Sequence, residues 1–263
     1  MVYPVYSRRS RGLSVGINLF PQKRICLFDC PYCEIFDFYD EGQNANRGTD
    51  FDLDNLKEDL ISALARAKKE HIPVKDICFS GSGEPTLSPH FSEALETAAR
   101  IRDEFVPDAE LVLITNASGL LQKNIFHLLK EKALEGLRVW LKIDAATEEW
   151  FRKMNQPRGI DFQNLQARIR DFAAEAPFIS QTMICKVEGS VPSQEEERAW
   201  IKLICDLAQK GKLRSVQIYG KARPSPKDPM AEAADVSILE TRARALREAL
   251  HLAAREVLVE VFP

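Results

Sequence analysis

Six apolar runs of strand length alternate with six amphipathic, helix-like stretches along most of this chain. Such alternation is typical of βα units, which bring their strands together as a parallel sheet. A closed barrel of these units needs eight strands, so six predict an α/β fold of the open kind, a partial (β/α)6 TIM-like barrel. The expected strands are residues 13–17, 75–79, 110–114, 138–143, 178–185 and 215–219.

Capping residues and turn formers indicate where the helices begin and where loops intervene. The region 42–50, rich in Asn, Gly and Asp, predicts a loop, and three prolines within 222–229 exclude a helix interior or a central strand there. The expected helix starts are Asp52 or Asp54, Ser88 followed by Pro89, a point near Asp161, and two capping boxes, Ser193 with Glu196 and Ser237 with Glu240.

The length of 263 residues suits one large domain, with a core over about residues 12–220 and a C-terminal extension over about 230–263. No apolar run reaches about 18 residues, so no membrane span is expected. The first nine residues lack the features of a secretory signal, and six cysteines are too few for a disulfide scaffold. Together these features predict a cytoplasmic protein.

Three of the cysteines, Cys26, Cys30 and Cys33, are close together in the sequence. Thiolates on one short loop can converge on a metal centre, because closing a short loop costs little entropy. Three ligands leave one iron of a four-iron cluster open to a small molecule, whereas ferredoxin-type clusters and structural zinc sites take four ligands. Two other interpretations stay open: part of a zinc or redox-sensing site completed elsewhere, and three unrelated core cysteines.

The unusual residues gather at one end of the expected sheet. Enzymes built on parallel strands place their chemistry at the carboxyl ends of the strands. The Gly-x-Gly-Glu-Pro run at 81–85 lacks the lysine of a phosphate-binding loop, and its glycines let a ligand approach the backbone. The segments that follow the six strands contain the three cysteines, Gly81–Glu84, Asn116, Asp144, Lys186, and residues 219–223.

The Cys-x3-Cys-x2-Cys pattern, with Tyr32 before its last cysteine and Gly81–Glu84 after the next strand, resembles the radical S-adenosylmethionine (radical SAM) superfamily. The resemblance implies that superfamily's partial barrel, a 4Fe-4S cluster on the three cysteines, and S-adenosylmethionine bound at the open iron. One electron from the cluster then breaks the sulfonium bond, which gives methionine and a 5′-deoxyadenosyl radical. It also implies an electron donor such as flavodoxin or ferredoxin.

Position at the strand ends and side-chain chemistry suggest roles for further residues, and the resemblance adds a set of cofactor-binding residues. Asp144 is a candidate for contact with substrate or cofactor. A desolvated Lys142 or Lys186 could form a Schiff base with a carbonyl substrate, although ion-paired or solvated lysines are the simpler interpretation. Core packing is the expected role of Cys78, Cys185 and Cys205. The implied cofactor-binding residues are Tyr32, Gly81, Ser82, Gly83, Glu84, Asn116 and Ser118, with Glu84 acting through its carboxylate.

Longer stretches resemble one branch of the superfamily, the tRNA wyosine-forming synthases. They are residues 12–19, residues 80–86, and residues 141–145 with 155–157. A tRNA nucleotide is therefore the first substrate hypothesis, and a protein or peptide substrate is the alternative. Those synthases carry a second cluster on further N-terminal cysteines, and this sequence has none before Cys26, so the resemblance does not extend to wyosine chemistry itself.

The net charge of −3 provides no overall attraction to nucleic acid. Arg223 could clamp a carboxylate or a phosphate after the last strand. A local basic rim beside the cysteine segment is one expected role, and a solvated face the other, of Arg8, Arg9, Arg11, Lys23 and Arg24.

Overall fold

The computed structural model describes residues 1–22, 24–35 and 51–263 of the chain, which divides into two compact units. The first unit comprises Met1–Cys26, Asp37–Thr115 and Glu135–Val139, and the second comprises Leu27–Phe36, Asn116–Leu134 and Trp140–Pro263. Lys23 of the expected basic rim and the expected loop at 42–50 lie outside the described residues. The single-domain organisation stays a prediction.

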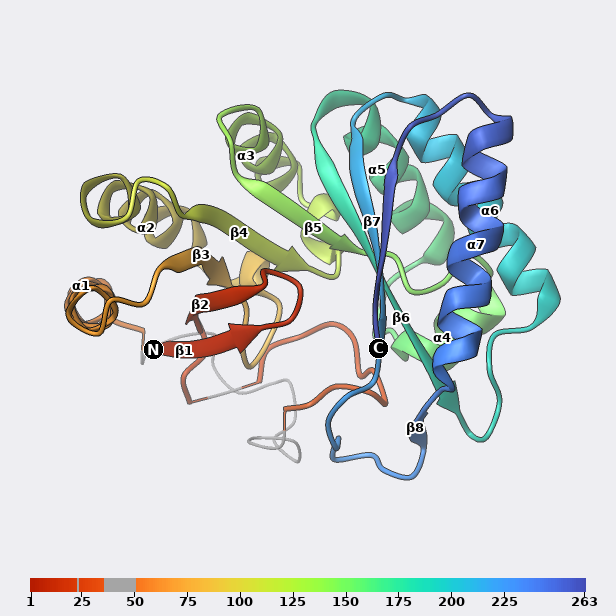
Figure 1. Ribbon diagram of the computed structural model, residues 1–263, viewed down its shortest axis with the longest axis horizontal. Helices are drawn as coiled ribbons and strands as arrows, with labels where there is room; N and C mark the ends of the chain where they lie inside the picture. Colours follow the sequence, from red (N-terminus) through yellow and green to blue (C-terminus); the bar gives the residue numbers. More distant parts are fainter. Residues whose placement is uncertain (23, 36–50) are drawn as a thin grey trace. The chain divides into compact units, whose positions relative to one another are not determined.

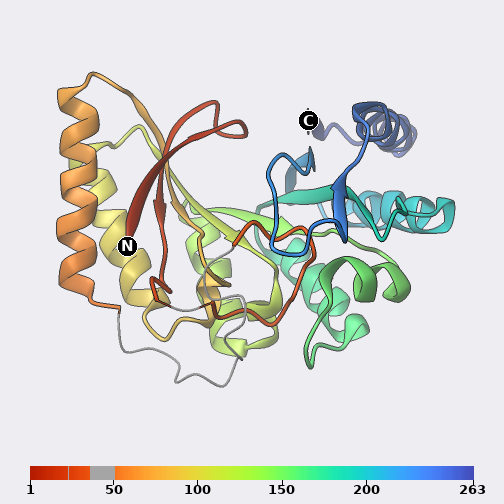
Figure 2. The same ribbon diagram turned by 90° about the horizontal axis from the view of Figure 1, so that it is seen from below.

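Strands β1 to β4 form the sheet of the first unit (Figure 1). Strand β1 (Val2–Ser7) pairs antiparallel with β2 (Gly12–Ile17), and β2 pairs in parallel with β3 (Val74–Phe79), as β3 does with β4 (Glu110–Thr115). Helices α1 (Leu53–Lys69) and α2 (Phe91–Phe105) lie side by side (Figure 2). Because β2, β3 and β4 run the same way, the segments that follow them leave the sheet at one edge.

The helix starts of the first unit follow the sequence only in part. Asp52 caps α1, since its Oδ1 accepts from the backbone N–H of Asp54 at 2.7 Å. The prediction that α2 starts at Ser88 and Pro89 is wrong: α2 begins at Phe91. A short 3-10 turn, η1 (Pro85–Leu87), precedes α2 in the chain, and Glu84 is the N-cap of that turn.

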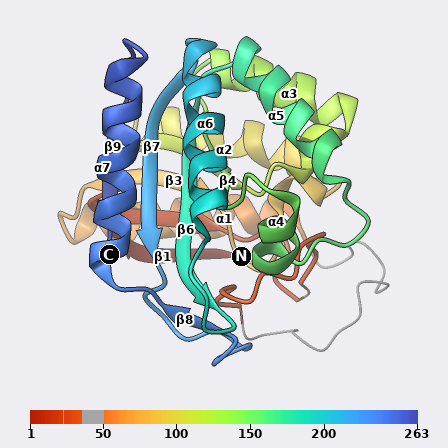
Figure 3. The same cartoon turned by 90° about the vertical axis from the view of Figure 1, so that its right-hand side faces the viewer.

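Strand β5 (Arg138–Lys142) begins in the first unit and continues in the second. There it pairs in parallel with β6 (Phe178–Val187), β6 with β7 (Leu213–Gly220), and β7 with β9 (Leu258–Phe262). Strand β8 (Ala231–Ala233) pairs antiparallel with the end of β6. Figure 3 shows α6 (Gln194–Gln209) and α7 (Val236–Leu252) side by side along this sheet. The remaining helices of this unit are η2 (Ser118–Leu121), α3 (Lys123–Leu134), α4 (Glu148–Asn155) and α5 (Phe162–Glu175).

Two capping boxes were expected in this unit, and neither forms in full. Asp235, not Ser237, caps α7 by accepting from the backbone N–H of Ser237 at 2.8 Å. Ser193 does cap α6 and accepts from the N–H of Glu196 at 3.1 Å. The Glu196 carboxylate does not return to Ser193, because it accepts from the N–H of Thr147 at 2.8 Å instead.

All six expected strands are present, as β2 to β7. The loop predicted at 222–229 is also present, whereas β1, β8 and α4 were not predicted. Pro4 is compatible with β1 because, among the described strands, β1 pairs only with β2 and so has an open edge. None of the helices in the described ranges is both long and apolar enough to cross a bilayer.

Candidate active site

In the first unit, the segment that leads to Cys26 is held against the loop that follows β3. Ile25 and Gly83 form a parallel bridge, and the backbone N–H of Glu84 donates to the Ile25 carbonyl at 2.8 Å. A Cβ on Gly83 would lie 2.3 Å from that carbonyl oxygen, so glycine is needed for this close approach. The start of the cysteine segment is thereby fixed beside residues 81–84.

Asn18 organises the first half of the same loop. Its Oδ1 accepts from the N–H of Ser82 at 3.1 Å, and its Nδ2 lies 3.0 Å from Ser82 Oγ. Gly81 has a φ of 129°, and a Cβ there would lie 2.7 Å from the Asn18 side chain. Asn18 belongs to residues 12–19, which resemble one branch of the superfamily, but this role was not predicted from the sequence.

Glu84 is 2% exposed, and its Oε1 accepts from two hydroxyl groups. Thr86 Oγ1 and Thr115 Oγ1 each lie 2.6 Å from it. The carboxylate predicted to contact the cofactor is therefore oriented by the turn that follows it and by the last residue of β4.

In the second unit, the cysteine segment pairs with the chain after α4. Phe28 and Pro157 form an antiparallel bridge. On either side of it, the N–H of Asp29 donates to the Asn155 carbonyl at 3.0 Å, and the N–H of Arg158 donates to the Leu27 carbonyl at 2.8 Å. A short stretch of backbone thus holds the residues immediately before Cys30. Cys33 follows in a turn, its N–H donating to the Cys30 carbonyl at 3.0 Å.

Asp144, at the end of β5, is the centre of a polar cluster. The residue is 3% exposed, and its carboxylate accepts from the Met183 N–H at 2.9 Å, the Asn155 Nδ2 at 3.1 Å and the Tyr32 hydroxyl. Lys142 Nζ lies 3.5 Å from Asp144 Oδ2. A buried carboxylate with this many donors is held in one orientation.

Lys142 completes the cluster and spans two aromatic rings. Its ammonium donates to the Tyr219 hydroxyl and lies 4.7 Å and 5.1 Å from the ring centroids of Tyr32 and Tyr219, within the range of cation–π attraction. Burial lowers the pKa of Lys142, but Asp144 and Tyr219 outweigh it and the net pKa is raised. Lys142 is therefore a cation at neutral pH. No role was predicted for Tyr219 beyond its place in residues 219–223.

Burial also governs the other titrating groups of this cluster. Burial raises the pKa of the Cys30 thiol to about 11, and the negative charge of Asp144 adds to the effect. The pKa of Tyr32 is raised for the same two reasons. A bound metal ion reverses the balance for a thiol, since coordination favours the thiolate.

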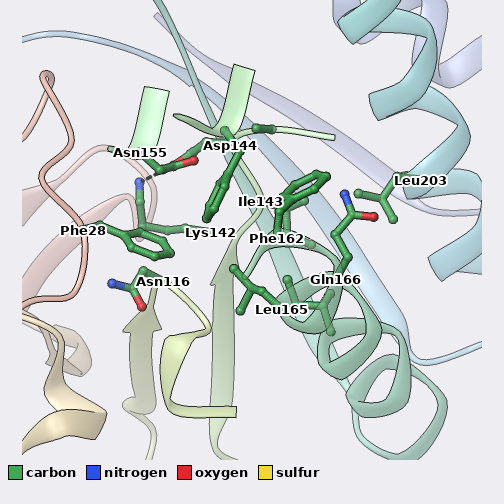
Figure 4. A pocket seen from close by; sticks show the side chains of 13 residues that line it. Phe28, Asn116, Lys142, Ile143, Asp144, Asn155, Phe162, Leu165, Gln166 and Leu203 are labelled. Atoms are coloured by element: carbon green, nitrogen blue, oxygen red, sulfur yellow. Dashed lines mark hydrogen bonds and ion pairs between the residues drawn. The ribbon is translucent and has the colours of Figure 1, made fainter. Parts of the chain in front are cut away.

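Figure 4 shows a cavity beside the cluster, with Lys142, Asp144 and Asn155 at one side and Phe162 and Leu165 of α5 at the other. Its volume of about 20 Å³ holds about one water molecule. The cavity is therefore too small to be a substrate site.

Asn116 and Ser118 lie together in the turn after β4, where the Ser118 N–H donates to Asn116 Oδ1 at 2.9 Å. Ala117 between them has a φ of 66°, a conformation uncommon outside glycine. Ser118 Oγ is buried without a hydrogen-bond partner among the described residues. Backbone strain and an unsatisfied hydroxyl are features often found at ligand sites.

The structure does not place Lys186 in this cluster. Lys142 is in register with Gln181 on the neighbouring strand, whereas Lys186 lies five residues further along β6, beside Glu232 of β8. Five residues of strand span roughly 16 Å.

Three arginines of the expected basic rim do not lie beside Cys26 in the first unit. Arg8, Arg9 and Arg11 lie in the turn between β1 and β2, whereas the cysteine segment follows the other end of β2. Strand β2 keeps the two apart by roughly 16 Å. Sequence proximity was misleading because a strand separates the turn from the segment.

Basic residues near the strand ends of the second unit are paired with acids. Arg223 lies 3.3 Å from Glu34, and Asp29 accepts from both Arg158, at 3.0 Å, and Lys227, at 2.8 Å. These pairs reduce the positive charge available to an anionic ligand.

The chemistry of the three thiols that are close together in the sequence suits an iron-sulfur cluster. Cys26, Cys30 and Cys33 are partly exposed and not in disulfides, whereas Cys78 and Cys185 are buried. Among the described residues, no three His, Cys, Asp or Glu side chains converge as ligands of one metal ion. A four-iron cluster does not require this convergence, because each thiolate binds a different iron.

Residues 23–185 match the family model described as the radical SAM superfamily. Two curated relatives are the UPF0026 proteins of Helicobacter pylori (strain J99) and Synechocystis. The first is 24% identical over 84% of this chain and 66% of its own length, and the second is 25% identical over 85% and 76%. The chain thus spans just under two thirds of the Helicobacter relative.

Solved structures share the fold at low sequence identity. A radical SAM methyltransferase from Sphaerobacter thermophilus has a TM-score of 0.68 at 15% identity, covering 99% of this chain and 69% of its own. SuiB of Streptococcus suis, bound to its precursor peptide SuiA, has a TM-score of 0.64 at 12% identity, and the match covers 97% of this chain and 51% of SuiB. TYW1 with a lysine-pyruvate adduct has a TM-score of 0.58 at 11% identity, and the match covers 91% of this chain and 74% of TYW1. The predicted partial α/β barrel is confirmed.

Proposed function

This chain belongs to the radical SAM superfamily, whose members use a 4Fe-4S cluster and S-adenosylmethionine, and we propose that it generates a 5′-deoxyadenosyl radical to modify a substrate. When bound, the cluster supplies the one electron that breaks the sulfonium bond of S-adenosylmethionine and releases methionine. The protein's own residues bind and orient the two groups.

Cys26, Cys30 and Cys33 are proposed as the cluster ligands. Three thiolates leave the fourth iron for the amino and carboxylate groups of S-adenosylmethionine. Residues 81–84 are proposed to hold the amino group, with Glu84 contributing its carboxylate. Asn116, Ser118 and Tyr32 remain the further candidates for cofactor contact.

The observation that carries this proposal is the bridge between Ile25 and Gly83. It fixes the chain entering the cysteine segment beside the proposed amino-group site within the same unit. A ligand that touches both an iron and Glu84 requires these two sequence regions to be neighbours, although about fifty residues separate them in the chain.

Anaerobic reconstitution with iron and sulfide tests the proposal. The protein should become brown, absorb in the sulfur-to-iron charge-transfer region, and release 5′-deoxyadenosine from S-adenosylmethionine when a strong reductant is added. Tight zinc binding without any cluster assembly would favour the alternative of a zinc or redox-sensing protein. The physiological reductant is proposed to be a flavodoxin or ferredoxin, and the compartment the cytoplasm.

The substrate is proposed to be a tRNA nucleotide, supported by the motifs shared with the wyosine-forming branch. A peptide is the second candidate, favoured by the ion pairing of Arg158, Arg223 and Lys227, which leaves less positive charge for phosphates. Binding to tRNA should weaken with salt by roughly 0.7 log unit per log salt for each single-strand phosphate contact. Absence of binding at low salt, compared with an unrelated acidic protein, would move the assignment to a peptide.

A further inference from the structure

We propose that Asn155 is a positioning residue whose side-chain amide donates a hydrogen bond to the Cys30 thiolate, and that Asp144 sets the direction of that amide. The inference rests on the proposed function, because it concerns a thiolate that would hold the cluster. Its basis is one nitrogen with two neighbours: Asn155 Nδ2 lies 3.6 Å from Cys30 Sγ and 3.1 Å from Asp144 Oδ2.

The orientation of the Asn155 amide follows from what it faces. A carboxylate only accepts hydrogen bonds, so the amide must turn its NH2 group toward Asp144. The two hydrogens on Nδ2 then serve two acceptors, Asp144 Oδ2 and Cys30 Sγ. The N–H of Met183, at 2.9 Å, holds the Asp144 carboxylate in place. Because the carboxylate cannot follow, a flip of the Asn155 amide would leave a buried carboxylate oxygen with one donor fewer.

The backbone keeps Asn155 and Cys30 together. The bridge between Phe28 and Pro157 and the hydrogen bond from Asp29 to the Asn155 carbonyl lie next to both residues. That carbonyl lies 3.7 Å from Cys30 Sγ and can accept only from a protonated thiol. With a thiolate it keeps its bond from Asp29, and Nδ2 is then the group suited to the sulfur.

A donor to a cluster sulfur favours the reduced cluster, because reduction adds negative charge around the thiolates. Asn155 would therefore raise the reduction potential and ease the electron transfer on which cleavage depends. A purely structural role for Asn155 would instead affect protein stability and leave the potential unchanged.

The test is an EPR-monitored redox titration of the reconstituted protein without S-adenosylmethionine. Asn155→Leu, close in shape and without a donor, should make reduction about tenfold less favourable, a fall of about 59 mV for one electron. Asn164→Leu, an exposed asparagine of α5 in the same unit, is the matched control and should leave the potential unchanged. If the leucine variant does not load iron, Asn155→Ala removes the donor without adding bulk and is measured in the same way.

A swapped pair separates the hydrogen bond from simple packing. The double variant Asn155→Asp with Asp144→Asn keeps an amide–carboxylate pair but turns a carboxylate toward the sulfur, so its potential should stay below that of the wild type. Recovery of the wild-type potential in the swap, or no change in the loaded Asn155→Leu or Asn155→Ala variant, would overturn the inference. Failure of the wild type to assemble a cluster would instead overturn the proposed function.

Discussion

Thr115 donates a hydrogen bond from Oγ1 to Glu84 Oε1 at 2.6 Å, which joins the end of β4 to the loop after β3. Both residues are buried. The carboxylate proposed to bind the cofactor is therefore oriented by its neighbours in the protein.

Glu84→Ala should weaken S-adenosylmethionine binding, because removing one charged partner from a buried pair costs about 2–5 kcal/mol. Calorimetric titration of the reconstituted protein measures the affinity, and iron analysis should still give one cluster. Thr115→Val, which removes a hydroxyl and keeps the shape, should cost about 1–3 kcal/mol of stability and a smaller part of the affinity. Unchanged affinity in Glu84→Ala would remove this residue from the site.

Replacing Cys26, Cys30 or Cys33 with alanine should abolish the reconstituted cluster, because each thiolate is proposed to hold one iron. Cys78→Ala and Cys185→Ala are the controls, since both residues are buried core thiols. Iron and sulfide assays after gel filtration measure the outcome. Loss of the cluster in a control that still unfolds cooperatively would point to a further ligand.

Lys142 should not form an imine with pyruvate at pH 7. Asp144 and Tyr219 raise the pKa of Lys142, so the neutral amine is rarer than in an ordinary lysine and increases only as the pH approaches the raised value. Incubation with pyruvate and borohydride, followed by peptide mass spectrometry, detects trapped adducts. The Lys142→Arg variant should give the same adduct pattern as the wild type. A borohydride-stable adduct on Lys142 at pH 7 would contradict the prediction.

Gly83→Ala should reduce cluster retention as well as stability. The added methyl group would meet the Ile25 carbonyl oxygen at 2.3 Å, so the bridge must open, at an expected cost of about 1–3 kcal/mol. Gly136→Ala is the control: no atom of the described residues outside its chain neighbours lies within 4 Å of the new Cβ, but φ is 117°, so only backbone strain is added. Both variants should melt at lower temperature, and only Gly83→Ala should lose iron faster to a chelator. Equal iron loss would mean that the bridge does not support the cysteine segment.

The six strands β2 to β7 could be predicted from the sequence because strand periodicity and turn residues are local signals. Helix α4 was missed because it is only eight residues long, although Thr147 followed by two glutamates is a reasonable start signal. Missing α4 also hid the role of Asn155. Its contact with Cys30 joins residues 125 positions apart, and no local pattern encodes it.

Glu196 is a second example, in which a contact between distant residues replaces a predicted local one. Serine followed three residues later by glutamate predicts a local capping box, and Ser193 does cap its helix. The Glu196 side chain is drawn away by the N–H groups of Ala146 and Thr147 at 2.7 and 2.8 Å. These N–H groups lie just before α4, and backbone N–H groups that leave solvent need an acceptor. Only the folded chain brings them to Glu196.

The backbone attachments of the cysteine segment, at Ile25 in one unit and at residues 27–29 in the other, bear on how iron is taken up. In small zinc domains the metal must order its own ligands, so that metal binding and folding are one event. Here hydrogen bonds of the protein already restrict the residues on both sides of Cys26. Ordering the backbone of one such residue otherwise costs about 1–2 kcal/mol of conformational free energy. Iron binding then carries little of this entropic penalty, and its affinity reflects mainly the strength of the iron–thiolate bonds.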